Sequence, residues 1–270
     1  MKVWILIIGV SLALLFTITP VAIAFGDKTT DFQELRSEHF MIRYQDGVSK
    51  DYVYDIKKTG EKFYRIITQQ FNLIRDKLWL WDNRAQVFIA KDQKEYLSKF
   101  GCSSWSGACV NYKAKIIYTY PNQKSFNSIF IHELTHIILH EYAGRNRLSL
   151  WLDEGVATYI EDKYSMGLYQ RRLSYLQNAI KQGKHIPLSE LIRTTSSVLT
   201  KKSADYVSLF YVESFSIVNF FSKRYGKYKF SNFLSRLKHG ESIESAISKS
   251  FSDCRNYEEL EKQWIKFYLK

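Results

Sequence analysis

The chain has 270 residues, of which 46% are hydrophobic, and its net charge is +12. A chain of this size can bury a substantial core, either as one large domain or as two lobes that share a cleft. The basic residues form short mixed clusters such as Lys57-Lys58 and Arg171-Arg172, which favours a solvated surface over a nucleic-acid-binding site. The positive charge still permits weak attraction to an anionic membrane or envelope surface.

Residues 1–24 have the pattern of an export signal. Lys2 precedes an apolar run, and Ala22-Ile23-Ala24 forms a small-x-small site at which a signal peptidase could cut. The alternative is an uncleaved anchor through residues 3–24, because this stretch is long enough to span a bilayer. Cleavage is the favoured interpretation, because the charged region is short and the small residues stand where cleavage needs them. Both interpretations predict an extracytoplasmic protein, which is secreted, periplasmic or membrane-anchored.

Between residues 25 and 122, short apolar segments alternate with helical patterns, which predicts an α/β lobe with a small mixed sheet and an edge strand. The first long helix has a weak point at Gly60. Its apolar side is predicted to consist of Tyr54, Ile56, Phe63, Ile66, Ile67 and Phe71. In chain order, the predicted elements are a first strand at 39–44, a helix at 51–73, a strand at 86–90, a helix at about 93–99, and strands at 109–111 and 114–120 that form a hairpin or one bent strand.

From residue 123 to residue 270 the pattern is helical, which predicts an all-helical second lobe and an α+β fold for the chain. Ser125 or Asn127 can cap the first of these helices, and Gly144 follows its end. The second helix of this lobe is predicted to begin near Trp151, and the third contains Leu173, Leu176 and Ile180 and stops at Gly183. A long fourth helix is predicted at 207–225, ending at Gly226, and further helices are predicted at 228–237, 243–251 and 257–269.

The stretch from Ser125 to Glu161 carries the chemistry. His132 and His136 lie one turn apart on one face of an amphipathic helix, because an α-helix has about 3.6 residues per turn. Glu154 follows on the next helix. Two neutral imidazoles and one carboxylate, with a fourth position left for water, are the ligand set of a catalytic zinc site. We therefore expect His132, His136 and Glu154 to bind Zn²⁺ and Glu133 to act as the general base.

Four neighbouring residues need separate assignments. His140 continues the helical spacing but lies about 12 Å from the first histidine along the axis, so it is expected at the surface or beside a ligand. Glu161 is either a partner for the free N–H of a ligating histidine or a plain surface carboxylate. Asp153 is expected beside a ligand or as a charge at the helix start. Glu141 is expected to be a solvated charge.

These residues resemble a known family. The motif His132-Glu133-Leu134-Thr135-His136, followed by Trp151-Leu152-Asp153-Glu154-Gly155-Val156-Ala157, is similar to the gluzincin zinc metallopeptidases, and in particular to peptidase MA-like domains that resemble a reduced aminopeptidase catalytic core. The resemblance implies a zincin-like two-lobe fold with the active site between the lobes. It also implies that Tyr211 donates to the oxyanion of the reaction, with Tyr206 as the reserve candidate.

The chain departs from the aminopeptidases of this clan at one strand. Those enzymes carry Gly-Ala-Met-Glu-Asn, whereas this chain has Gly107-Ala108-Cys109-Val110-Asn111. A valine cannot pair with an ammonium group, so the comparison implies that Val110 removes the recognition of a free N-terminus. Endopeptidase action on an extended chain is then favoured, with the strand at 114–120 expected to pair with the substrate through the edge of the sheet.

The three cysteines are Cys102, Cys109 and Cys254. In an exported protein Cys102 and Cys109 could close a small loop through a disulfide, but the odd number leaves this question open. Their spacing is poor for a structural metal site.

The sequence thus predicts an exported zinc-dependent metallopeptidase, a hydrolase that acts on peptides or proteins and not on nucleic acid. The alternative is a catalytically silent, peptidase-like binding or scaffold protein of the cell envelope, because a complete site can still be closed by its loops. The pattern leaves the oligomeric state open.

Overall fold

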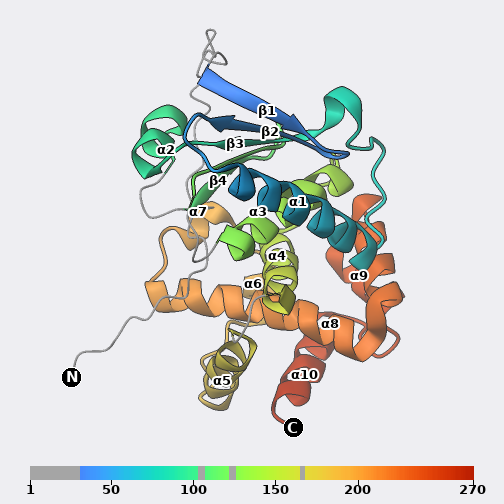
Figure 1. Cartoon of the computed structure of the whole chain (residues 1–270). Coiled ribbons are helices and arrows are strands. Elements are labelled where there is room, and N and C mark those ends of the chain that lie inside the picture. Colours follow the sequence, from blue (N-terminus) through green and yellow to red (C-terminus); the bar gives the residue numbers. More distant parts are fainter. Residues whose placement is uncertain (1–30, 103–106, 122–125, 165–167) are drawn as a thin grey trace, which may run out of the picture.

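A five-stranded sheet is followed along the chain by a set of helices (Figure 1). The computed structural model describes residues 31–102, 107–121, 126–164 and 168–270. The predicted export signal and the cap candidate Ser125 lie outside these ranges. The sheet and the long helix α8 (Ala204–Lys238) lie on opposite sides of α3 (Phe126–Ala143) and α4 (Leu150–Tyr164) (Figure 1). The predicted α+β fold, with a small mixed sheet and a helical lobe, is confirmed.

The sheet is mixed and has the order β1-β2-β3-β5-β4. Its central strands β2 (Phe40–Gln45), β3 (Ala85–Ile89) and β5 (Ile116–Thr119) run parallel to one another. The outer strands β1 (Phe32–Arg36) and β4 (Ala108–Asn111) each pair antiparallel with a central neighbour.

Two predictions about the strands are wrong. Strand β1 precedes the segment predicted as the first strand and was not predicted. Its apolar pattern is weak, because Phe32 and Leu35 are its only half-buried residues and the other three are exposed. The segment predicted at 114–120 is not at the edge, because β5 lies between β3 and β4. The edge strand that contacts α3 is therefore β4.

Helix α1 (Lys50–Gln70) packs against β2 and α3. Gly60 permits the close approach, because a Cβ atom at this position would lie 3.1 Å from the ring of Phe40. Tyr54 is 55% exposed, which corrects its assignment to the apolar side of the helix. It lies outside the stripe of buried residues, which follows the helical repeat from Val53.

The helical lobe contains the predicted helices and two one-turn helices that were not predicted, because a single turn has no periodicity to detect. Helix α8 is interrupted at Gly226, where φ is 78°, so the predicted helix end at this glycine is confirmed. Among the described residues, no helix is long and apolar enough to cross a membrane. The remaining helices are η3 (Trp81–Asn83), α2 (Gln93–Phe100), α5 (Leu168–Lys181), α6 (Leu188–Leu191), α7 (Ser196–Leu199), α9 (Ile243–Ser250) and α10 (Tyr257–Tyr268).

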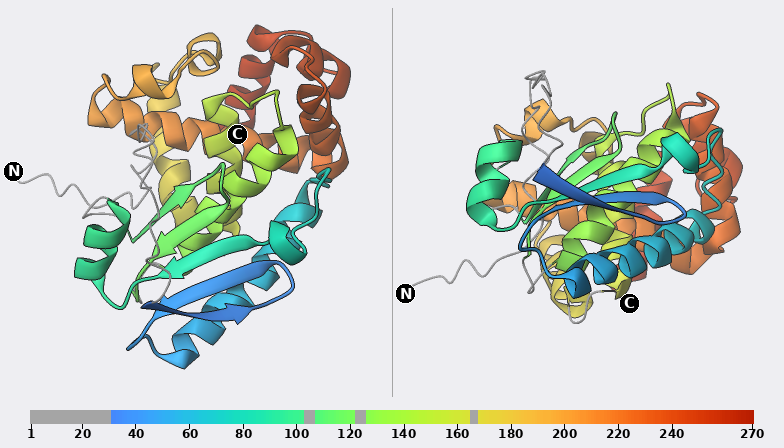
Figure 2. Two further views of the ribbon diagram at one scale, coloured as in Figure 1. Left: turned by 90° about the horizontal axis from the view of Figure 1, so that it is seen from above. Right: turned by 45° about the horizontal axis from the view of Figure 1, so that its top comes forward.

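Helix α3 is buried on all sides through its middle, since residues 130–139 are all buried. It contacts α1 and β4 in the sheet lobe and α4 and α8 in the helical lobe (Figure 2). The prediction of an amphipathic helix is therefore wrong, because a helix enclosed between two layers has no solvent-facing side over this stretch. The predicted site consequently lies in the interior.

Helices α4 and α8 approach so closely that no side chain fits between them at one point. At Gly155 an added Cβ atom would lie 2.5 Å from the backbone oxygen of Ser214 and 3.0 Å from the side chain of Val218. A backbone oxygen in a packed helix cannot move aside easily. Gly155 directly follows Glu154, so this close contact lies next to a predicted metal ligand.

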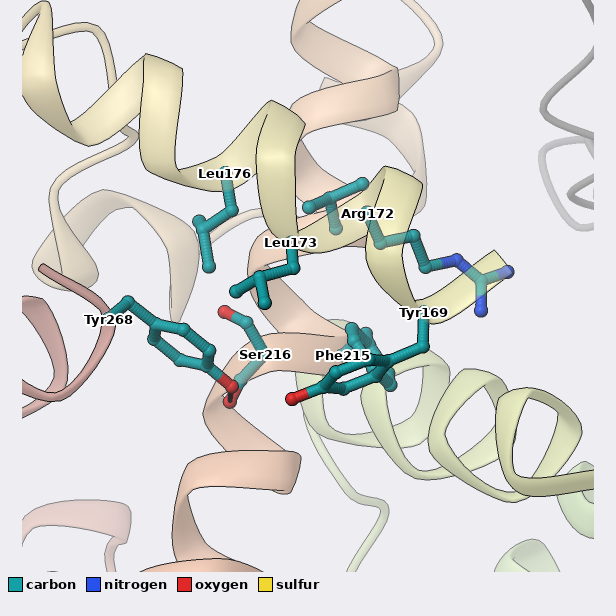
Figure 3. A pocket seen from close by; sticks show the side chains of 8 residues that line it. Tyr169, Arg172, Leu173, Leu176, Phe215, Ser216 and Tyr268 are labelled. Atoms are coloured by element: carbon teal, nitrogen blue, oxygen red, sulfur yellow. Dashed lines mark hydrogen bonds between the residues drawn. The ribbon is translucent and has the colours of Figure 1, made fainter. Parts of the chain in front are cut away.

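A crevice among α5, α8 and α10 belongs to the core of the helical lobe (Figure 3). Leu173, Leu176 and Phe215 are among its lining residues, and it has no room for a water molecule. At its edge the Tyr268 hydroxyl donates to the backbone oxygen of Ser216 over 3.0 Å. The crevice is a packing feature rather than a substrate site.

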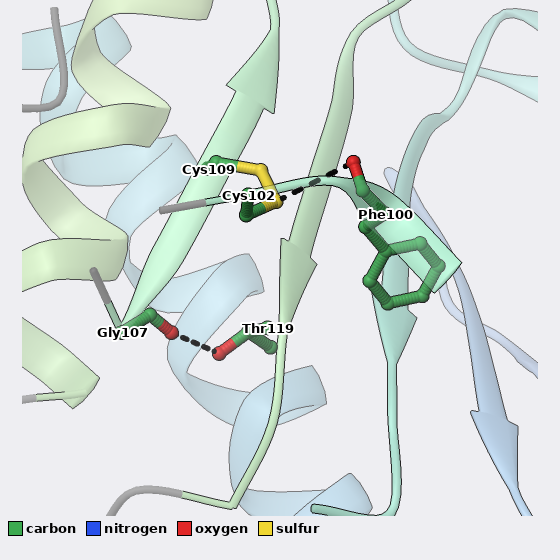
Figure 4. Close-up of a disulfide and its surroundings, with 5 residues drawn as sticks. All are labelled: Phe100, Cys102, Gly107, Cys109 and Thr119. Atoms are coloured by element: carbon green, nitrogen blue, oxygen red, sulfur yellow. Dashed lines mark hydrogen bonds between the residues drawn. A yellow bond between two sulfur atoms is a disulfide. The ribbon is translucent and has the colours of Figure 1, made fainter. Parts of the chain in front are cut away.

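Cys102 and Cys109 form a disulfide, which answers the question that the sequence left open (Figure 4). The bond joins β4 to the segment that follows α2. At the same end of the hairpin, Thr119 Oγ1 donates to the backbone oxygen of Gly107 over 2.8 Å. Cys254 is a free, buried cysteine. The β4–β5 hairpin is thus fixed at its base by a covalent bond and a buried hydrogen bond.

Candidate metal centre

Three side chains from α3 and α4 converge in the interior. The Nε2 atoms of His132 and His136 lie 3.1 Å apart, and Oε2 of Glu154 lies 3.6 Å from each. Ligand atoms bound at about 2.1 Å around a tetrahedral zinc ion are about 3.4 Å from one another. Among the described residues, neither carboxylate oxygen of Glu154 has a hydrogen-bond partner. Both the spacing and the unpaired buried carboxylate fit a zinc ion at this point.

The second ring nitrogen of each histidine has an acidic neighbour. His132 Nδ1 lies 3.1 Å from Glu161 Oε2, and His136 Nδ1 lies 2.9 Å from Asp153 Oδ1. The other oxygen of Asp153 lies 2.9 Å from His140 Nε2. Such carboxylates orient the rings so that their Nε2 atoms face the position that a metal ion would take. The interpretation of Glu161, Asp153 and His140 as neighbours of the ligands is confirmed, and Glu161 is buried rather than a surface carboxylate.

Acidic neighbours raise the pKa of both histidines in the metal-free protein. Burial lowers the pKa of His132, but the neighbouring Glu154 and Glu161 carboxylates outweigh burial and raise the pKa to about 9. Burial is also outweighed at His136, where Asp153 and Glu154 raise the pKa well above its ordinary value. A metal ion must therefore displace protons from the imidazoles when it binds.

Glu133 lies beside these residues and is only 1% exposed. Its Oε2 atom accepts a hydrogen bond of 3.3 Å from the Tyr112 hydroxyl, whereas Oε1 has no partner among the described residues. Burial raises the pKa of Glu133, although the positive charges of His132 and His136 oppose this effect. A buried carboxylate with a raised pKa and one unpaired oxygen is suited to general-base chemistry.

Tyr112 was not predicted as a site residue. It directly follows β4, and its ring centroid lies 4.8 Å from that of His140 and 5.8 Å from that of His136. Burial and the nearby Glu133 carboxylate raise the pKa of Tyr112 well above its ordinary value. The only signal in the sequence was its position immediately after Asn111, at the end of the strand that resembles the aminopeptidase motif.

The two tyrosines on α8 differ in their surroundings. Burial, and then the Glu154 and Glu133 carboxylates, raise the pKa of Tyr211, so its hydroxyl lies within electrostatic reach of the site. This hydroxyl has no hydrogen-bond partner among the described residues. The Tyr206 hydroxyl instead donates to Glu190 over 2.9 Å. The Tyr211 hydroxyl is thus buried, unpaired among the described residues and subject to the charges of Glu154 and Glu133, whereas the Tyr206 hydroxyl has a different partner.

Two charged residues that the sequence assigned to the solvent are at least half-buried. Arg172 is buried; its Nη2 atom lies 4.0 Å from Glu161, and its Nη1 atom donates to Asp162 over 2.7 Å. Glu141 is half-buried and pairs with Lys115 Nζ over 3.2 Å. Both assignments are wrong because hydrophobic periodicity does not reveal charged side chains that find partners in the interior.

The family of the chain follows from a comparison of its sequence with known families. The sequence model of the Peptidase MA superfamily matches residues 97–270, which is more than half of the chain and includes the whole site. The chain belongs to the Peptidase MA superfamily. The resemblance to peptidase MA-like domains is thereby confirmed. No curated protein matches this Peptidase MA chain.

Solved structures with the same fold include leukotriene A4 hydrolase. The native enzyme from yeast has 15% sequence identity and a TM-score of 0.53, over 87% of this chain and 39% of the other. A second native structure, from Saccharomyces cerevisiae, has the same identity and coverage and a TM-score of 0.51. This Peptidase MA chain therefore spans about 39% of the length of these hydrolases. The family and the fold together support a zinc metallopeptidase-like function.

Proposed function

We propose that the protein is an exported, gluzincin-type zinc endopeptidase. The observation that carries this proposal is the convergence of His132, His136 and Glu154 beside Glu133, whose Oε1 atom is unpaired. The export-signal pattern supports the location, and the Cys102–Cys109 disulfide also favours an oxidising compartment.

The residues of the site have complementary roles in this proposal. A zinc ion held by His132, His136 and Glu154 would activate water by lowering its pKa from about 15.7 toward 7. Glu133 takes the proton from the attacking water and passes it to the leaving amine. The free hydroxyl of Tyr211 donates to the oxyanion that forms when the peptide carbonyl is attacked.

The choice of endopeptidase action is supported by strand β4. This strand offers no carboxylate to a substrate's free amine, and Val110 packs against the core instead. Among the described residues β4 is an outer strand of the sheet and pairs with β5, and in this proposal an extended substrate adds to it by backbone hydrogen bonds. In this proposal the substrate pairs with β4, and not with the segment 114–120.

The Glu133→Gln variant tests the proposed mechanism. The variant should retain zinc, because the three ligands are intact, and should lose cleavage of an unfolded protein by at least about 10²-fold, because an amide cannot accept the proton. We would measure zinc content and the cleavage of an unfolded protein, with and without chelator. Peptides with free and with blocked N-termini, compared in the same assay, should be cleaved internally at similar rates.

A matched control is Glu258→Gln, which makes the same chemical change at an exposed residue of α10 and should leave cleavage unchanged. Cleavage retained in Glu133→Gln would overturn the mechanism. Wild-type protein that binds zinc but cleaves none of the substrates would favour the alternative, a peptidase-like binding protein. This alternative is tested because Glu133 and His136 are only 1% and 0% exposed, as expected for a site that is closed to substrate.

A further inference from the structure

We propose that Tyr112 is a positioning residue that holds the carboxylate of Glu133 with one oxygen directed to the reacting water. This inference rests on the proposed peptidase function and extends it to a residue that neither the zinc motif nor the family resemblance assigns.

The contact between Tyr112 and Glu133 makes the two oxygens of the Glu133 carboxylate different. Tyr112 donates to Glu133 Oε2 over 3.3 Å, and Oε1 is left without a partner among the described residues. A carboxylate held at one oxygen cannot rotate freely about its last side-chain torsion, which otherwise has a broad, two-fold preference. The hydrogen bond therefore selects one rotation of the group and leaves a single oxygen free to accept a proton.

The position of Tyr112 is determined by the turn between β4 and β5. The Asn111 side chain accepts a hydrogen bond of 3.1 Å from the backbone N–H of Ala114, and Lys115 N–H donates to the backbone oxygen of Tyr112 over 3.3 Å. Lys115 Nζ also lies 3.2 Å from Glu141 at the end of α3. The turn is thus tied to the helix that carries Glu133, so the phenol and the carboxylate are held by one connected framework.

The surroundings of Tyr112 give it a different task from that of Tyr211. The ring of Tyr112 lies against His136 and His140, and its hydroxyl is already used by Glu133. The hydroxyl of Tyr211 has no partner among the described residues and is free for the substrate. The two phenols therefore serve the base and the oxyanion separately.

The Tyr112→Phe variant removes only the hydroxyl and keeps the ring on His136 and His140. Loss of a hydrogen bond to a charged group should lower kcat about tenfold. KM should change less than about twofold, because the substrate does not touch this hydroxyl, and zinc content should stay at the wild-type value. The matched control is Tyr118→Phe on the same hairpin, where the ring packs against Phe88 and Phe100 outside the site. This control should keep the wild-type kcat.

A second measurement does not depend on turnover. Unfolding of the wild type, Tyr112→Phe, Glu133→Ala and the double variant forms a double-mutant cycle in the zinc-loaded protein, because alanine removes both oxygens that could accept from the phenol. If the two side chains interact, the effects of the single changes on the unfolding equilibrium constant should depart from additivity by at least about threefold. A cycle of Tyr118→Phe with Glu133→Ala should be additive.

The outcomes separate this inference from the proposed function. Additive effects of Tyr112→Phe and Glu133→Ala, or an unchanged kcat in an active Tyr112→Phe enzyme, would overturn the role of Tyr112 and leave the peptidase proposal intact. A wild type without zinc-dependent cleavage would refute the peptidase proposal, and with it any catalytic role for Tyr112, whatever the cycle shows. Non-additivity together with a fall in kcat supports the inference.

Discussion

The hydroxyl of Tyr211 and the hydroxyl of Tyr206 are engaged differently, although both residues lie on α8. Tyr211 is buried and its hydroxyl is unpaired among the described residues, whereas Tyr206 donates to Glu190. A free donor in an enclosed site can stabilise developing negative charge strongly, because little solvent screens it. This contrast makes the two residues a matched pair for mutation.

We predict that Tyr211→Phe lowers kcat by about 10²–10³-fold, the cost of removing one oxyanion donor, while zinc affinity stays the same. Tyr206→Phe should keep kcat within about twofold of the wild type, because its hydroxyl serves Glu190. Steady-state kinetics on one peptide, together with zinc titration of both variants, would check this. Equal losses in the two variants would contradict the assignment of the donor.

The acidic residues behind the histidines show which details a linear pattern can supply. Glu161 lies seven residues after Glu154 on one helix, so helical spacing alone placed it near a histidine. Arg172 lies on a different helix, and its approach to Glu161 depends on how α5 packs beside α4. The spacing within one helix is predictable from the sequence, and the contact between two helices is not.

Helices α4 and α8 make a close contact at Gly155, next to the predicted ligand Glu154. Gly155→Ala would normally stabilise a helix by about 1 kcal/mol. Here we predict a net loss of about 1–3 kcal/mol in the free energy of unfolding, because the new methyl group meets the backbone oxygen of Ser214 at 2.5 Å. Chemical denaturation of the wild type and the variant would measure this loss.

Gly60→Ala is the matched control, since Gly60 is also buried inside a helix. Its added methyl group would meet only the ring of Phe40 at 3.1 Å, and a side chain can shift where a backbone oxygen cannot. The loss of stability should therefore be smaller than for Gly155→Ala. A Gly155→Ala protein as stable as the wild type would show that the two helices separate at little cost.

Across the whole molecule, a zinc ion would link α3 to α4 at the centre of the structure, where the sheet lobe and the helical lobe meet. Anything that binds the folded chain and not the unfolded chain raises its stability. The protonated form of His132 stabilises the metal-free fold below its unfolded pKa of about 6.5, and this contribution is lost as the pH rises through about 9. Zinc would compete with these protons for the imidazole nitrogens.

We therefore predict that the increase in Tm caused by one equivalent of zinc grows as the pH rises from 6.5 to about 9. Over this range the metal-free protein loses the stabilisation from protonated His132, while the imidazoles become available to the metal. Thermal unfolding with zinc and with chelator at several pH values would measure the difference. The Glu154→Ala variant, which lacks one ligand, should show a much smaller zinc effect. A zinc effect that falls with pH would contradict the prediction.

The sequence by itself determined the core of the site, because His132, Glu133 and His136 belong to one helix whose period fixes their relative directions. It also determined most helices and the helix end at Gly226, since these depend on local patterns. Only the tertiary structure decided that β4, and not the segment 114–120, lies at an edge of the sheet, because strand order depends on pairing between distant segments. The burial of α3 and the contact of Tyr112 with Glu133 were likewise decided by the packing of separate elements, which no local period records.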